Sequence, residues 1–240
     1  MLLTDFRKMI RQTLFCVGTD GNELCQGVFL EKSRGALVMT ATDNRRLGLA
    51  KFDAGDGFPD FERIMVPTNV LRKIAKSKAD TSTLSIYVSN NEACFDIGYA
   101  RITAKPLAGR LGRFPKDQKE FHRIFPLSFT VDRLPLLEAL RMVSAVIDLG
   151  LGHPVFLSLS SGTLALRTDH NDDCANAEIP CDYLGEKSEP VFNARYITEI
   201  TEHIDADRLE IRFAGDHLNA AVLPVPRNGC FFLFARMRQY

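Results

Sequence analysis

Residues 36–44 read Ala-Leu-Val-Met-Thr-Ala-Thr-Asp-Asn, and residues 163–171 read Thr-Leu-Ala-Leu-Arg-Thr-Asp-His-Asn. Each stretch has the alternating pattern of a β-strand and then reaches Thr-Asp, which is typical of a strand that ends at a turn. The two stretches lie about 126 residues apart in a chain of 240. This spacing indicates that the chain contains the same fold twice.

The segments around the two stretches repeat in the same order. Apolar residues recur at helical spacing over residues 4–17 and again over residues 133–147, ahead of each stretch. A second helix is predicted after each stretch, and Asp132, Thr68 and Asn193 occupy positions expected for helix N-caps. Each half then closes with short alternating strands, predicted at 84–89, 93–97, 100–105, 209–213, 218–223 and 230–235.

The order helix, strands, helix, strands therefore occurs twice, and each unit is long enough to form a domain. We predict an α+β fold with two duplicated domains, 1–126 and 127–240, each with antiparallel sheets covered on one face by two helices. The basic, Gly- and Pro-rich segment 106–123 is predicted to be a long loop ahead of the joint between the domains.

The formal net charge is zero, but the charge is divided between the halves. Residues 1–126 hold 20 Lys and Arg against 14 Asp and Glu, a net of +6, and residues 127–240 hold 10 against 16, a net of −6. The two halves are therefore expected to face different electrostatic partners, or each other.

Several classes of protein are not expected. No run of 18 apolar residues predicts a membrane span, and the N-terminus resembles the start of a folded helix more than a signal peptide, so we expect a cytoplasmic protein. The six cysteines form no CxxC pair and are expected to be reduced thiols. Walker, Rossmann, G-x-S-x-G and HExxH motifs are absent, so we predict no enzyme and no cofactor.

One dense polar cluster covers residues 169–174 and reads Asp-His-Asn-Asp-Asp-Cys. It could be a loop that binds a divalent metal, but it lacks the Gly and the distal Glu of an EF-hand. The same residue types are those that hairpin turns prefer. We favour the hairpin turn and predict no metal site.

Short motifs in matching order relate the chain to a known family. Thr42-Asp43-Asn44-Arg45-Arg46-Leu47, Gly112-Arg113-Phe114-Pro115 and Phe192-Asn193-Ala194-Arg195-Tyr196 resemble motifs of the bacterial DNA polymerase III beta subunit, the sliding clamp. The similarity extends over nearly the whole chain but covers only the second and third of the family's three domains. Whether the chain is a natural two-domain protein or a fragment stays open, although a Met just ahead of the first helix favours a natural start.

The resemblance implies a ring that encircles duplex DNA without reading its sequence. Lys and Arg on the helices that line such a ring would face phosphates. The predicted DNA-facing residues are Arg7, Lys8, Arg11, Arg72, Lys73 and Lys76. An ordinary solvated helix face is the alternative, although residues 68–78 hold four cations and no acid. The helices of the second half are richer in acids, which argues against DNA contact there.

The resemblance also implies a groove between the two domains that binds short clamp motifs of DNA polymerases and the clamp loader. An extended peptide with apolar anchors needs aliphatic and aromatic walls and a few polar groups. Taken singly, Leu47, Ile124 or Leu233 would be explained as well by core packing. The matching positions are Cys25, Thr42, Arg45, Arg46, Leu47, Pro115, Ile124, Tyr196, Leu218, Leu233, Phe234, Met237 and Arg238.

The chain departs from the family pattern at the predicted groove. Arg45 replaces a His, and Cys25 stands where a Leu is common. About four residues near 116–119 look inserted. In the tail, which is two residues longer, Arg236 replaces a Pro. These differences fall on the residues and the segment that would form the walls of the predicted groove.

Two functions therefore stand. The chain is a DNA-encircling processivity factor, or it is an interaction module, a decoy or regulator, that binds clamp-motif partners without encircling DNA. Because the family ring contains six domains, a two-domain chain is expected to close it as a homotrimer.

Overall fold

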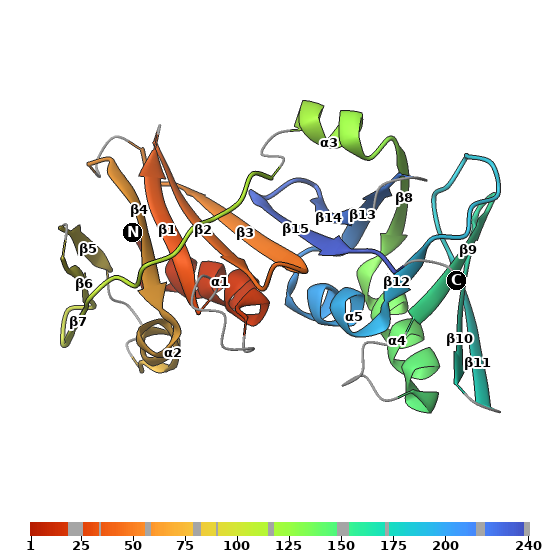
Figure 1. Cartoon of the computed structure of the whole chain (residues 1–240), viewed down its shortest axis with the longest axis horizontal. Coiled ribbons are helices and arrows are strands. Elements are labelled where there is room, and N and C mark those ends of the chain that lie inside the picture. Colours follow the sequence, from red (N-terminus) through yellow and green to blue (C-terminus); the bar gives the residue numbers. More distant parts are fainter. Residues whose placement is uncertain are drawn as a thin grey trace. The chain divides into compact units, whose positions relative to one another are not determined.

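The computed structural model describes residues 1–18, 26–33, 35–55, 59–78, 83–89, 91–114, 118–147, 154–170, 173–214 and 219–237. The chain divides into two compact units, Met1–Arg113 and Phe114–Tyr240 (Figure 1). None of the helices in the described ranges is long and apolar enough to cross a membrane.

The described residues of the first unit form two antiparallel sheets and two α-helices. One sheet has the order β4-β1-β2-β3, and the other has the order β5-β6-β7. The elements in chain order are α1 (Leu3–Thr13), the 3-10 turn η1 (Leu14–Cys16), β1 (Gly27–Ser33), β2 (Ala36–Thr42), β3 (Arg46–Asp53), β4 (Phe61–Pro67), α2 (Thr68–Lys76), β5 (Ser85–Val88), β6 (Ala93–Asp96) and β7 (Arg101–Ala104).

The apolar stripes of both helices form the core of this unit. Phe6 and Ile10 of α1 are almost completely buried, and the Phe6 ring lies 5.8 Å from the Phe95 ring of β6. Leu71 and Ile74 bury the corresponding face of α2. Because the apolar residues follow the helical period, the opposite face of each helix is left for charged side chains.

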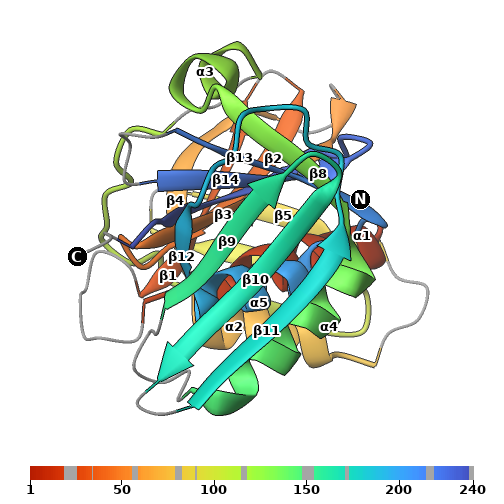
Figure 2. The same ribbon diagram turned by 90° about the vertical axis from the view of Figure 1, so that its right-hand side faces the viewer.

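The second unit repeats this plan. One sheet has the order β15-β14-β13-β8 and the other β11-β10-β9-β12, and Figure 2 shows α4 and α5 behind the sheet of β9, β10 and β11. The elements are α3 (Gln118–Ile124), β8 (Leu127–Asp132), α4 (Arg133–Val143), η4 (Ser144–Val146), β9 (Pro154–Ser160), β10 (Thr163–His170), β11 (Asp173–Pro180), β12 (Val191–Asn193), α5 (Ala194–His203), β13 (Arg208–Phe213), β14 (Asn219–Val225) and β15 (Cys230–Ala235). The predicted α+β fold of two duplicated domains is confirmed.

Helix α3 corrects the prediction of a long loop over residues 106–123. Phe121 and Phe125 lie four residues apart, both are buried, and their ring centroids are 6.3 Å apart. Phe121 also packs edge-on against Phe231 of β15 at 4.8 Å. This apolar pairing stabilises a short helix within a segment whose charge and Gly and Pro content suggest a loop. The contact between Phe121 and Phe231 places α3 with the second unit. The domain boundary at residue 126 stays a prediction.

The three predicted N-caps have different outcomes. The Asn193 side chain accepts a hydrogen bond from the Tyr196 backbone N–H at 3.2 Å, as predicted. Asp132 occupies the N-cap position of α4 but makes no capping bond, and its Oδ1 accepts from Arg208 Nε at 3.1 Å. Thr68 was predicted wrongly, because Pro67 holds the N-cap position and Thr68 is the first residue of α2.

The polar cluster at 169–174 lies at the end of a hairpin. Asp169 pairs with Cys174 and His170 pairs with Asp173 across β10 and β11. Asn171 and Asp172 lie outside the described residues. Within the described part of the chain, no group of three or more His, Cys, Asp or Glu side chains is placed to hold a metal. The geometry favours the hairpin interpretation.

Candidate nucleic-acid and peptide interfaces

Helix α2 presents a cationic face. Val70, Leu71 and Ile74 are buried, and the intervening cations point away from them. Arg72, Lys73 and Lys76 are exposed, and none of the three forms an ion pair with an acid within the described part of the chain. Three unneutralised cations on one short helix attract phosphate.

The cations of α1 differ from one another in their exposure and in their contacts. Arg7 donates from Nη2 to Ser77 Oγ at 2.8 Å and also to the Ser77 backbone carbonyl, so its guanidinium ties α1 to the C-terminal end of α2. Lys8 is half-buried and Arg11 is exposed. Of the predicted DNA-facing residues, Arg7 therefore has a structural role that the sequence did not reveal.

Two arginines on the helices of the second unit form ion pairs with acids, and a third is held by a backbone carbonyl. Arg141 pairs with Glu202 at 2.7 Å, and Arg195 pairs with Glu199 at 2.8 Å. Arg133 donates from Nε to the Ala206 carbonyl at 2.9 Å. These helices therefore offer little free positive charge, which agrees with the acidic composition of this half.

The predicted peptide-site residues of the first unit form a tight turn between β2 and β3. Thr42 Oγ1 donates to the Arg46 carbonyl at 2.7 Å and accepts from the Asn44 N–H at 3.0 Å. Arg46 Nε donates to Asp43 Oδ2 at 3.0 Å, and its guanidinium lies over the Phe15 ring. Asn44 adopts φ 68°, a left-handed conformation that Asn tolerates. Thr42, Arg46 and Leu47 are buried, and Arg45 is exposed.

Three of the predicted residues of the second unit, Tyr196, Phe234 and Met237, lie close to β12. Met237 donates its backbone N–H to the Val191 carbonyl at 3.1 Å. Arg236 and Phe192 form a single antiparallel β-bridge through their backbones. Tyr196 is the third residue of α5, the helix that follows β12 directly. The tail and Tyr196 are thus both attached to one short strand.

The predicted peptide-site residues differ in how far their side chains are exposed. Phe234 is buried, and its ring meets the Phe192 ring edge-on at 5.0 Å. Tyr196, Leu233, Met237 and Ile124 are half-buried and keep surface for a ligand. Arg236 packs over aromatic rings, and burial lowers the pKa of its guanidinium. Four predicted residues lie outside the described ranges: Cys25, Pro115, Leu218 and Arg238.

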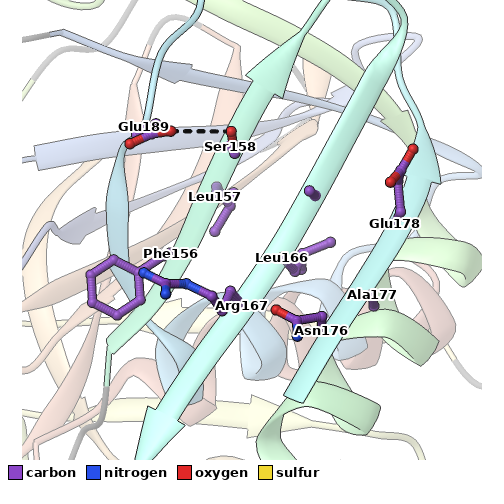
Figure 3. A pocket seen from close by; sticks show the side chains of 10 residues that line it. Phe156, Leu157, Ser158, Leu166, Arg167, Asn176, Ala177, Glu178 and Glu189 are labelled. Atoms are coloured by element: carbon purple, nitrogen blue, oxygen red, sulfur yellow. Dashed lines mark hydrogen bonds between the residues drawn. The ribbon is translucent and has the colours of Figure 1, made fainter. Parts of the chain in front are cut away.

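A hollow of about 420 Å³ lies on the outer face of the second unit's β9–β11 sheet (Figure 3). The Arg167 guanidinium lies over the Phe156 ring, with its Cζ atom 5.1 Å from the ring centroid. Glu178 projects from β11. The Ser158 hydroxyl donates to Glu189 Oε1 at 3.3 Å. The sequence prediction did not include this hollow. The alternation of residues 163–170 indicates which side chains face outward but not that they border a concave surface.

Comparisons with known proteins identify relatives of both units. Residues 3–116 match the family model of the DNA polymerase III beta subunit central domain, and residues 114–231 match that of its C-terminal domain. The chain is 24% identical over 241 residues to the beta sliding clamp of Treponema pallidum, covering 98% of this chain and 64% of the relative. It is 28% identical to that of Caulobacter vibrioides, covering 86% and 56%.

A structural comparison gives the same fold. A crystal structure of the DNA polymerase sliding clamp from Pseudomonas aeruginosa superposes with a TM-score of 0.88 at 21% identity. The superposition covers 100% of this chain and 66% of the clamp. The chain therefore spans about two thirds or less of the length of these relatives.

Proposed function

Because the chain belongs to the DNA polymerase III beta subunit family, we propose that it is a processivity factor that encircles duplex DNA without sequence preference. The observation that carries this proposal is the cationic face of α2, formed by Arg72, Lys73 and Lys76. Exposed cations that face phosphates hold a protein on DNA without reading bases, because the backbone charge is the same for every sequence. A processivity role requires no catalytic group.

We further propose that the chain binds clamp-motif peptides of DNA polymerases and the clamp loader. Each unit supplies groups of the kind that bind an extended peptide. The rigid turn at Thr42–Leu47 exposes a cation, and the half-buried Tyr196 and Met237 give an apolar surface. Peptides that bind in extended form use apolar anchors for affinity and polar groups for register.

The second candidate is an interaction module that binds the same peptides without enclosing DNA. The ion pairs Arg141–Glu202 and Arg195–Glu199 favour it, because they remove the positive charge that a DNA-lining helix needs. The two candidates share the peptide site and differ only in the ring.

The test uses the topology of DNA and needs no loading factor. The protein is mixed with linear duplex at low salt, the ends are ligated, and the salt is raised before gel filtration. A closed ring stays with the circle, and one restriction cut releases it, because no base contacts hold it. Release from the intact circle at the salt concentration that releases it from linear DNA would contradict encirclement and favour the interaction module.

A further inference from the structure

We propose that Arg236 is a carboxylate-binding residue beside the peptide site, and that it makes the chain prefer peptides that bring a carboxylate to that point. This inference rests on the proposed peptide binding and names a ligand chemistry for it. The observations that carry it are the fixed, half-buried guanidinium, the lack of an acid partner among the described residues, and the position of Arg236 next to Met237.

The second unit holds the Arg236 side chain in place. Its Cζ atom lies 6.0 Å from the centroid of the Phe192 ring and 5.7 Å from that of the Phe213 ring. Its Nη1 donates to the Ala214 backbone carbonyl at the end of β13. Because these contacts fix the guanidinium before any ligand arrives, a ligand that binds it has little side-chain ordering to offset.

Part of the hydrogen-bonding capacity of Arg236 is unused. Its Nε is buried without a hydrogen-bond partner, and its Nη2 donates to no group within the described part of the chain. Burial lowers the pKa of the guanidinium, which means that the charged form is poorly solvated, although an arginine keeps its proton at neutral pH. A carboxylate would supply both the missing acceptor and the opposite charge.

Other arginines of the second unit already have an acid partner. Those that form an ion pair are Arg141, Arg167, Arg195, Arg208, Arg212 and Arg227. Arg236 pairs with no Asp or Glu in the described ranges, and it is half-buried, so part of its side chain stays open to a ligand. Cations that are withdrawn from water are usually paired. We therefore expect the partner of Arg236 to come from the bound peptide.

The position of Arg236 suits a peptide that also contacts Met237. The two residues are consecutive, so their Cα atoms lie about 3.8 Å apart. An extended peptide advances about 3.3 Å per residue, so a peptide anchored at Met237 is long enough to place a carboxylate at Arg236. Residues 127–240 carry a net charge of −6, which disfavours acidic peptides unless a local cation attracts them.

The test compares acidic and neutral peptides by fluorescence anisotropy. The probe is a labelled clamp-motif peptide of a bacterial DNA polymerase with an amidated C-terminus, carrying Glu or Gln at one position at a time. A further neutral peptide keeps its free C-terminal carboxylate. We expect one carboxylate-bearing peptide to bind wild type about tenfold or more tightly than its neutral counterpart, the usual effect of a hydrogen bond to a charged group. An internal Glu or the free terminus, whichever gives the gain, identifies the source of the carboxylate.

Three variants assign the preference to Arg236. Arg236→Gln should abolish the difference between acidic and neutral peptides, and Arg236→Lys should keep part of it, because Lys retains the charge without the planar fork. Arg167→Gln is the matched control. Arg167 also lies over an aromatic ring, that of Phe156 (Figure 3), but it already pairs with Asp169 at 3.3 Å. Its loss should leave the acid preference unchanged. A merely structural role for Arg236 would weaken all peptides alike.

The outcomes separate this inference from the proposed function. Equal binding of acidic and neutral peptides by wild type, at every position and at the terminus, would overturn the inference and leave peptide binding standing. This comparison needs no variant, so it holds even if circular dichroism shows that Arg236→Gln is unfolded. An acid preference that persists in folded Arg236→Gln would also overturn it. A folded wild-type protein that binds none of the peptides would refute the proposed peptide binding together with the inference.

Discussion

At the scale of single residues, Asn193 and Thr68 give a paired test of helix capping. The Asn193 side chain caps α5 through the Tyr196 N–H, whereas Thr68 lies inside the first turn of α2 and makes no capping bond. Asn193→Ala should lower the free energy of unfolding by about 1 kcal/mol, the usual value of an N-cap. Thr68→Ala should change it by less than half as much. Urea unfolding followed by circular dichroism measures both, and equal losses would contradict the assignment.

Met237 is the residue whose substitution tests the peptide site. Its backbone is fixed by the bond to Val191, and its half-buried side chain keeps surface for a ligand. Met237→Ala should weaken binding of a clamp-motif peptide by about 1 kcal/mol or more, as expected for an anchor residue. Met142→Ala on α4, where the side chain is 59% exposed, is the control. Unchanged affinity of a folded Met237→Ala protein in calorimetric titration would remove Met237 from the site.

At the scale of elements, α2 and the helices of the second unit should differ in their contribution to DNA binding. Arg72→Gln with Lys76→Gln removes two cations that form no ion pair among the described residues. The slope of log affinity against log salt should then flatten by roughly 0.9 for each phosphate that the variant no longer neutralises. The effect should be equal for unrelated duplex sequences. Arg141→Gln with Arg195→Gln removes two cations that already pair with Glu202 and Glu199, so the slope should stay unchanged. A sequence-dependent effect would indicate base recognition and contradict a sliding ring.

Elements with a clear apolar period could be predicted from the sequence, and elements defined by tertiary packing could not. Helices α1 and α2 were predicted because Phe6, Ile10, Leu71 and Ile74 recur at helical spacing and form the core. Helix α3 was missed because its stability comes from Phe121 packing on Phe231, a residue far along the chain. Tertiary packing overrides local composition in such segments.

The residues of the candidate site could likewise be predicted only in part. Matching motifs identify which residues to consider, but not which of their side chains are engaged. The burial of Arg46 against Asp43 and Phe15, and the bond from Arg7 to Ser77, depend on partners that local sequence patterns do not identify. These interactions turn two predicted ligand-binding cations into residues that also hold the fold, and they become visible only in the folded chain.

At the scale of the whole molecule, the charge division favours an ordered assembly. Residues 1–126 carry +6 and residues 127–240 carry −6. A head-to-tail contact brings opposite charges together at every junction, whereas a like-to-like contact opposes equal charges. Such contacts close into a ring when the rotation per protomer divides the circle evenly.

A ring of six similar domains requires three copies of a two-domain chain, each turning about 120°. We therefore predict a homotrimer of 26.9 kDa chains, with a mass by light scattering near three chains at low salt. The assembly should weaken as salt rises, because its junctions depend partly on opposite charges. A mass near three chains that falls with salt supports the ring. A concentration-independent mass of one chain would leave no closed hole for DNA, and the peptide-binding module would then be the function that the molecule retains.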